Sequence, residues 1–273
     1  MKNFLTKITL RKIFHFSAVI FFGLFILLLT SVITEEVLSP NCNVAKIPVR
    51  GEIVGYKSGG SEDWTDEAVA GDIYNLIERA DNDSEIEAII VEINSRGGSG
   101  VSGQELANAL KRASKPTVAL IKEEAASAAY YLATGADKIF VSEFSSIGSI
   151  AVTQSFSDDV EKSKKEGYNY NQLQTGKYKD MFSGDRPLTY EERQMILKEL
   201  ESVHDVLIKE IAVNRGLEVS EVAKIADGSD INTKKALELG LIDAFGDLYE
   251  VKQYLAQTLG LSVADINVCD DAY

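Results

Sequence analysis

The chemistry open to this sequence is limited by its histidines, of which there are only two. A Ser-His-Asp triad needs an imidazole beside the nucleophile. His15 lies in an apolar run near the N-terminus, and His204 lies in a predicted amphipathic helix, where a packed or solvated side chain is the ordinary interpretation. A serine hydrolase built from this chain would therefore need another base, and lysine is the alternative that serine nucleophiles use.

One serine stands where a nucleophile would be expected. Residues 125–131 (AASAAYY) place Ser127 between small residues, at the predicted junction of a strand and a helix. Such a junction exposes the hydroxyl and brings it close to unpaired helix N–H groups, which favour a developing oxyanion. An ordinary N-cap serine would occupy the same position, so this segment alone does not establish a nucleophile.

A glycine-rich turn, residues 93–100 (INSRGGSG), also follows a predicted strand. In a parallel sheet, the two turns would lie at the same carboxyl edge, where sites form. Gly97 and Gly98 let the backbone approach a ligand, so the Gly98 N–H could pair with that of Ala128 to hold a carbonyl oxygen. A tight turn before a helix is the alternative interpretation.

The elements that would position these turns can be predicted from hydrophobic periodicity. The pattern predicts strands at residues 44–54, 86–93, 116–121 and 138–141, and helices at residues 65–80, 101–112 and 127–134. Alternation of this kind indicates an α/β fold with a mostly parallel sheet. The C-terminal part is predicted to be helical, at residues 189–215, 219–226, 233–239 and 248–259.

Charge divides the 273 residues into a basic N-terminal segment and an acidic body. The first 33 residues hold four basic side chains and no acid, which leaves 24 basic and 42 acidic residues in the remainder. An acidic body does not favour nucleic acid, whose phosphates require clustered cations. Neither the cysteines nor the histidines have metal-site spacing, so we expect no metal and no cofactor.

An uncharged run at residues 13–33 would span a bilayer core as a helix. Its basic flank predicts a signal anchor with a cytoplasmic N-terminus and an extracytoplasmic body at the cell membrane; a cleaved signal peptide is the alternative. The predicted organisation is a cytoplasmic basic segment, an anchor, a linker, a catalytic domain and an acidic tail, at residues 1–12, 13–33, 34–43, 44–260 and 261–273. Cys42 and Cys269 could form a disulfide outside the cell or remain two unpaired thiols.

Several separated motifs, in order, resemble the short form of bacterial signal peptide peptidase A over about residues 44–250. They are INSRGG (93–98), KPTVAL (115–120), AASAAYYLATGADKI (125–139), SSIGSIAV (145–152), TGKYKD (175–180), IADG (225–228) and ALELGLIDAFG (236–246). The resemblance implies a fold like that of Clp protease and crotonase, a right-handed spiral of strands and helices. It also implies a serine protease with a Ser-Lys dyad.

The resemblance assigns roles to individual residues. It implies Ser127 as nucleophile, Lys179 as general base, Ser149 as the hydroxyl that orients the lysine, and the N–H groups of Gly98 and Ala128 as the oxyanion hole. A lysine base must be neutral, and burial is the usual means of disfavouring the ammonium. Lys177, two residues away, would point to the same face of an extended segment and is the second candidate base.

The remaining predicted positions concern substrate. Residues that could line a specificity pocket or bind the peptide are Gly97, Ile147, Gly148, Ile150, Ala151 and Val152. The resemblance implies endoproteolysis of hydrophobic segments, such as signal peptide remnants and pieces of membrane proteins, by a homo-oligomeric ring. The alternatives are a membrane protease dedicated to a stomatin-like partner, a crotonase-fold acyl-CoA enzyme, and an inactive oligomeric scaffold.

The sequence departs from the family pattern at two places. Arg96 stands where the family usually has proline, which removes a rigid φ beside the oxyanion turn. Ala128 and Ala129 stand where two glycines are usual, and alanine suits the start of a helix. We hypothesise that the Arg96 cation keeps the nearby lysine neutral or binds a substrate carboxylate. Unchanged activity and an unchanged pH profile in Arg96→Pro would contradict this hypothesis.

Overall fold

The computed structural model describes residues 42–57 and 67–269. Nearly all of the described residues belong to one compact unit, Asn43–Tyr273. The predicted cytoplasmic segment and anchor lie outside the described residues. Within the part of the chain that is described, no helix combines the length and the apolar character needed to cross a bilayer. Cys42 and Cys269 are both disulfide-bonded.

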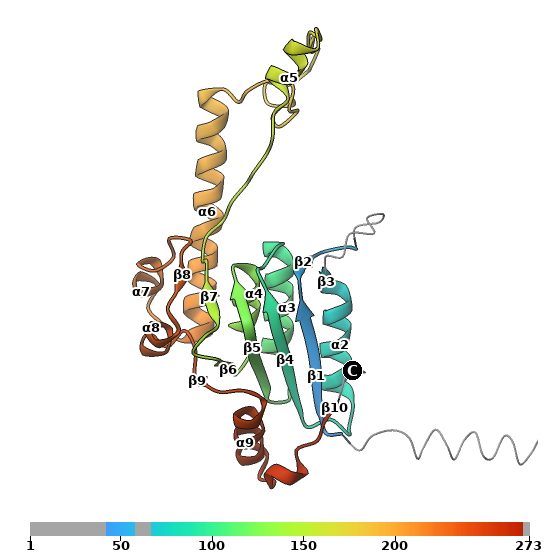
Figure 1. The fold of residues 1–273 in the computed structure, drawn as a ribbon, viewed down its shortest axis with the longest axis vertical. Helices are drawn as coiled ribbons and strands as arrows, with labels where there is room; N and C mark the ends of the chain where they lie inside the picture. Colours follow the sequence, from blue (N-terminus) through green and yellow to red (C-terminus); the bar gives the residue numbers. More distant parts are fainter. Residues whose placement is uncertain (1–41, 58–66, 270–273) are drawn as a thin grey trace, which may run out of the picture. The chain divides into compact units, whose positions relative to one another are not determined.

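An eight-stranded sheet forms the centre of this unit (Figure 1). Its main path runs in the order β10, β1, β4, β5, β6 and β9, and every pair along it is parallel. These strands span Val268–Cys269, Val44–Arg50, Ala88–Ser95, Thr117–Ala126, Lys138–Val141 and Ala244–Phe245. The predicted class, an α/β fold with a mostly parallel sheet, is therefore confirmed.

Strand β5 is long enough to pair with two neighbours in succession. Residues Val118 to Ile121 pair with β6, and Glu124 to Ala126 pair with β7 (Ser146–Gly148). Strand β7 in turn pairs antiparallel with β8 (Asp230–Ile231). This change of partner brings the chain after β7 beside the end of β5.

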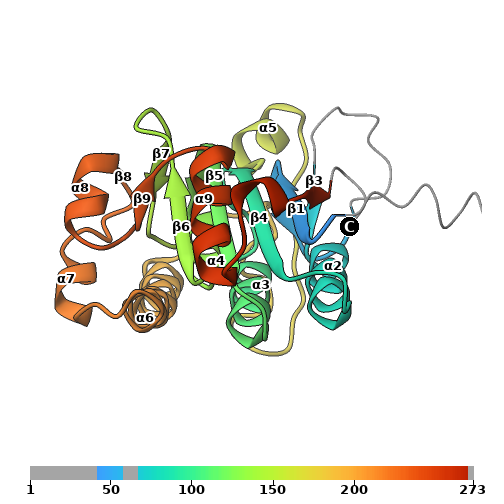
Figure 2. The same cartoon turned by 90° about the horizontal axis from the view of Figure 1, so that it is seen from below.

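Helices cover both faces of the sheet (Figures 1 and 2). Helix α2 (Ala70–Asn82) contacts β1 and β4, α3 (Gly100–Arg112) packs against α2, and α4 (Ala128–Ala133) packs against α3 and contacts β4 and β5. The opposite face carries α9 (Leu248–Leu259). Because strand side chains alternate between faces, each central strand contributes apolar residues to both layers.

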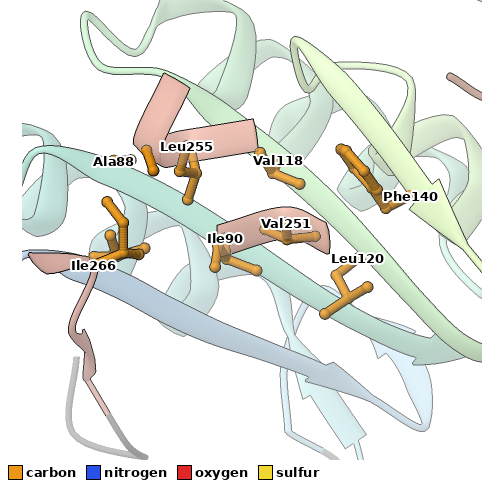
Figure 3. Packing of buried hydrophobic residues seen from close by; sticks show 10 residues of the cluster. Ala88, Ile90, Val118, Leu120, Phe140, Val251, Leu255 and Ile266 are labelled. Carbon is orange, nitrogen blue, oxygen red and sulfur yellow. The ribbon is translucent and has the colours of Figure 1, made fainter. Parts of the chain in front are cut away.

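The core under α9 is shown in Figure 3. Val251 and Leu255 of the helix pack against side chains that β4, β5 and β6 direct to this face, and all of these residues are buried. The cluster comprises Val44, Ala88, Ile90, Val118, Leu120, Phe140, Val251, Leu255, Ala256 and Ile266. Burying one such side chain fully is worth roughly 1.5–3 kcal/mol.

The C-terminal part is helical, as predicted. Helix α6 (Tyr190–Arg215) begins with a capping box at Thr189 and ends at Gly216, whose φ of 64° is left-handed. It is followed by α7 (Val219–Ala223) and α8 (Thr233–Glu238). The chain from β7 to α6 includes α5 (Val160–Lys165), which lies beside the N-terminal end of α6, where that helix stands clear of the sheet (Figure 1).

Several boundaries differ from the sequence predictions, among them the end of β5, which continues to Ala126 beyond the predicted residue 121. The predicted strand at 44–54 is divided at Gly51 (φ 77°), so that β2 (Glu52–Val54) leaves the main sheet and pairs with β3 (Glu67–Val69). The helix predicted from Thr65 begins only at Ala70, because residues 67–69 form β3. The 3₁₀ helix Val263–Asp265 and strand β10 occupy residues that the sequence placed in a C-terminal tail.

Close packing of α3 against α4 generates a first prediction. A methyl group on Gly103 would lie 2.8 Å from the Ala128 carbonyl oxygen, whereas one on Gly100, in the same helix, would have nothing within 4 Å. We expect Gly103→Ala to lower the free energy of unfolding by about 1–3 kcal/mol. We expect Gly100→Ala to be neutral or slightly stabilising. Urea unfolding of both variants checks this. Equal changes in the free energy of unfolding would show that α4 moves to accommodate the added methyl group at no cost.

Candidate active site

Ser127 occupies the sharp junction between β5 and α4. Its φ of 54° and ψ of −123° are uncommon for a residue other than glycine. The Ser127 N–H donates to the Gly148 carbonyl oxygen at 2.8 Å, and its carbonyl accepts from the Tyr131 N–H at 3.0 Å. The side chain makes no capping hydrogen bond. Ser127 is the N-cap residue of α4 by position, but its side chain does not cap the helix, so the hydroxyl of this half-buried residue is not committed to it.

The glycine-rich turn lies directly against Ser127. A methyl group on Gly97 would be 2.9 Å from both the Ser127 Cβ and the Ala128 nitrogen, so only glycine fits here. Gly97 also has a φ of 97°, which favours glycine. Register explains the approach, since Ser95 at the end of β4 pairs with Ala125 of β5. The predicted meeting of the two turns at one sheet edge is thus observed.

The peptide between Gly97 and Gly98 is oriented by strand β2. The Ile53 N–H donates to the Gly97 carbonyl at 2.8 Å, and the Ser99 N–H donates to the Ile53 carbonyl at 2.8 Å. Because a trans peptide is planar, the Gly98 N–H points opposite to the Gly97 carbonyl and away from Ile53. Ala128 is the first residue of α4, where an N–H has no partner within the helix. Both groups are suited to hold an oxyanion.

Ser149 directly follows β7, the strand that pairs with the end of β5 just before Ser127. Gly148 pairs with Ala126 and accepts the Ser127 N–H, so Ser149 is the next residue along from that contact. Its φ of 50° is left-handed, and its N–H donates to the Ser229 carbonyl at 2.9 Å. The residue is half-buried. Ser127 and Ser149 are therefore brought together by the β5–β7 pairing.

The residues predicted to line a specificity pocket separate into two groups. Ile147 and Ile150 are completely buried, so their side chains belong to the core here. Gly148 is also buried, and a methyl group on it would lie 2.9 Å from Ile231. Ala151 and Val152 are partly exposed and can meet a ligand.

Lys179 does not join the two serines in this chain. It lies in the segment 152–189, and its neighbours Lys177 and Asp180 are joined by ion pairs to the first turn of α6, through Glu191 and through Arg186 with Glu192. The residue is exposed, and no hydrogen bond or ion pair between described residues links it to Ser127 or Ser149. The burial that a neutral lysine requires is therefore not provided by one copy of the described chain.

Lys177, the second candidate base, is held as a cation. Its ammonium donates to Glu191, which is the main reason that its pKa is raised above the ordinary value. The same ammonium lies 5.2 Å from the centre of the Tyr178 ring. A raised pKa is the reverse of what a general base needs. The structure thus disfavours Lys177.

A cluster of ion pairs holds the part of the segment 152–189 that contains Lys179. The sequence analysis did not predict this cluster. Arg186 donates to Asp180 at 3.0 Å and to both oxygens of Glu192 at 2.9 and 2.6 Å. Tyr170 donates to Asp180 at 2.8 Å. The carboxylates are nearly buried, with side chains 6% and 4% exposed. The immediate neighbour of Lys179 is therefore fixed, although the lysine itself is not.

Arg96 forms an ion pair with Glu124, at 3.1 Å, on the strand that leads to Ser127. The Arg96 side chain is 89% exposed. No described contact joins it to a lysine.

No cluster of three or more His, Cys, Asp or Glu side chains in the described ranges is arranged to hold a metal ion.

Comparison with known proteins gives the family. The model of peptidase family S49 matches residues 109–262, more than half of the chain. A protein of Methanocaldococcus jannaschii, provisionally named a protease, is 30% identical over 194 residues, which are 70% of this chain and 62% of that protein. This chain belongs to peptidase family S49.

Other relatives agree with this assignment. A protein of Enterococcus faecium, provisionally named a signal peptide peptidase, is 29% identical over 78% of this chain and 64% of its own length. The chain thus spans less than two thirds of these relatives. An alanine mutant of the 1510-N membrane-bound stomatin-specific protease has a TM-score of 0.52 at 17% identity, covering 79% of this chain and 85% of that one. This likeness concerns the fold alone, and it agrees with the predicted α/β class.

The cluster around Arg186 generates a pH prediction. The hydrogen bonds from Arg186 lower the pKa of Glu192 from 4.5 to about 2. A lowered pKa contributes stability that is present above pH 4.5 and is lost as the pH falls towards about 2. We expect the thermal midpoint to fall less steeply across this window in Glu192→Gln than in the unaltered protein. Glu199→Gln, an exposed change on the same helix, is the control and should follow the unaltered profile; a parallel profile for Glu192→Gln would contradict the assignment.

Proposed function

We propose that this chain is a membrane-anchored serine endopeptidase whose nucleophile is Ser127. The observation that carries the proposal is the junction at Ser127, with an uncommon φ and a hydroxyl not used for capping, packed against the Gly97–Gly98 turn. Strained backbone of this kind persists where the surrounding structure enforces it, and nucleophiles on sharp strand-to-helix turns are a recurrent case. Membership of peptidase family S49 supports the reaction class.

The proposed reaction proceeds through an acyl-enzyme. A neutral Lys179 amine takes the proton from the Ser127 hydroxyl as its oxygen attacks the scissile carbonyl. The N–H groups of Gly98 and Ala128 stabilise the negative charge on the tetrahedral intermediate. The resulting ammonium returns the proton to the leaving amine, and water, deprotonated by the same amine, hydrolyses the ester. Ser149 orients the amine.

Lys179 is proposed to act on the Ser127 of a second copy in a homo-oligomer. The exposed position of this lysine at the end of α6, together with the fixed Asp180 beside it, supports a role between copies. Contact with a neighbouring copy and with the peptide would remove water from the amine and so favour its neutral form. A ring of copies is the expected assembly. A contact between two different surfaces of the protein can repeat from each copy to the next, and the repeats close into a ring when the rotation between neighbouring copies has cyclic symmetry.

The proposed substrates are hydrophobic peptides at the outer face of the membrane, such as signal peptide remnants. The apolar run at residues 13–33 supports tethering, which raises the local concentration of membrane-derived peptides. The partly exposed Ala151 and Val152 beside Ser149 offer small apolar contacts. A single stomatin-like partner is a second substrate candidate, favoured by the fold likeness to the stomatin-specific protease.

Labelling with a fluorophosphonate and cleavage of a synthetic signal peptide test the dyad. We expect Ser127→Ala and Lys179→Ala each to lower kcat/KM by about a thousandfold or more. Lys177→Ala, the matched control two residues away, should stay within about threefold of the unaltered protein, as is usual for surface changes. Labelling that persists in Lys179→Ala would identify another base. An unaltered protein that neither labels nor cleaves would favour an inactive scaffold.

Mixing of inactive variants tests the contribution of a second copy. Oligomers assembled from Ser127→Ala and Lys179→Ala chains would contain intact sites only if serine and lysine come from different copies. Random assembly then restores about one quarter of the sites. A dyad within one chain predicts no recovery, and that outcome would overturn the intersubunit arrangement without affecting the assignment of either residue.

A further inference from the structure

The hydroxyl of Ser95 links two backbone segments beneath the oxyanion turn. Ser95 ends β4 and is 3% exposed. Its O–H donates to the Gly51 carbonyl oxygen at 2.6 Å, and its oxygen accepts the Gly97 N–H at 3.1 Å. Gly51 lies at the point where β1 gives way to β2. One side chain therefore connects the turn to the strand that flanks it.

The two peptides that enclose Gly97 have different anchors. The peptide before it is held through its N–H by Ser95, and the peptide after it is held through its carbonyl by Ile53. The φ and ψ of Gly97 are the rotations between these two planes, so both anchors are needed to set them. Two consecutive glycines with φ of 97° and 144° have no side chains to restrict these rotations. The direction of the Gly98 N–H depends on the result.

The side chain at position 96 gives no such restriction. Arg96 is 89% exposed and contacts Glu124, which lies on the neighbouring strand. A proline at this position would fix its own φ through the ring. In this chain, the turn therefore depends on a hydrogen bond where a rigid residue would have limited it covalently.

We propose that Ser95 is a positioning residue that sets the oxyanion hole. Its hydroxyl fixes the Gly97 peptide, and through it the direction of the Gly98 N–H towards the carbonyl attacked by Ser127. This inference rests on the proposed function, since it assigns a residue to the same site. Ser95 acts through the backbone and does not touch the substrate.

A positioning role has a characteristic kinetic signature. An oxyanion donor acts on charge that develops in the transition state, so its misplacement lowers kcat more than it raises KM. We expect Ser95→Ala to lower kcat by about tenfold to a hundredfold, less than loss of a whole oxyanion donor. The affinity for a peptide aldehyde, whose adduct places an oxyanion in the same position, should fall by a similar factor.

A matched control is available in the same sheet. Ser146 in β7 is a serine whose buried hydroxyl has no hydrogen-bond partner among the described residues. Ser146→Ala makes the identical chemical change without removing a backbone anchor. We expect it to leave kcat and KM within about twofold of the unaltered protein.

Arg96→Pro tests whether the Ser95 hydroxyl acts by restricting the turn at Gly97 and Gly98. If the Ser95 hydroxyl restricts the turn, a proline ring should take over part of that restriction. Removal of the hydroxyl should then cost less in the proline background, so that Ser95→Ala lowers kcat about threefold to tenfold in Arg96→Pro. An equal loss in both backgrounds would show that the hydroxyl acts independently of the turn, and the inference would fail.

Hydrogen exchange of the segment 95–100 gives a readout that does not need activity. We expect the Gly97 and Gly98 amides to exchange faster in Ser95→Ala than in the unaltered protein. In the double variant, Ser95→Ala with Arg96→Pro, they should exchange more slowly than in Ser95→Ala alone. Unchanged exchange and unchanged kcat in Ser95→Ala overturn the inference. A raised KM with constant kcat, or an equal loss in Ser146→Ala, overturns it as well.

The two proposals fail in different ways. If the unaltered protein does not react with a fluorophosphonate at Ser127, the proposed function is wrong, whatever the exchange data show. If the unaltered protein reacts and Ser95→Ala reacts at the same rate with the same exchange, only the role of Ser95 is wrong.

Discussion

The change of partner along β5 is the constraint on which the site depends. The strand pairs with β6 until Ile121, and then its last residues pair with β7. A single hydrogen bond, from the Ser127 N–H to the Gly148 carbonyl, closes this second pairing. The chain must then turn at once into α4, which forces Ser127 into the left-handed region. Without this pairing neither the sharp turn at Ser127 nor its proximity to Ser149 would follow.

Electrostatics separates the site into a rigid half and a projecting half. The serine half is held by backbone hydrogen bonds and apolar packing, and glycine is required where α3, α4 and the oxyanion turn approach one another. The lysine half is held by charge, since Arg186 joins the nearly buried carboxylate of Asp180 to that of Glu192 in α6. Each half therefore keeps its geometry through its own interactions.

Much of the fold could be predicted because its central elements are long and periodic. The strands β4 and β6 and the helices α3, α6 and α9 lie within about two residues of the predicted bounds. Strands of two or three residues, such as β8 and β9, were not predicted. Such strands carry no usable period, and they exist because a neighbouring strand offers unpaired backbone groups.

The candidate site, like the fold, could be predicted from the sequence only in part. The turn at Gly97 lies against Ser127 and Ala128, because parallel strands place their following turns at one edge. The Arg186 cluster joins residues six apart on a segment that is mostly irregular, and no period marks such contacts. The burial of Ile147 and Ile150 depends on β7 and on the chain around α6, which local sequence does not specify.

The residues of β1 have a consequence for its outer edge. In the described residues, β10 pairs with Val44 and Ala45 at the start of that edge. Pro48 lies farther along β1 and has no N–H to offer, and the strand ends in the charged Arg50. Proline and charge on an edge strand discourage a foreign strand from extending the sheet. This edge of the sheet is therefore protected against the fibrous growth to which open edges are prone.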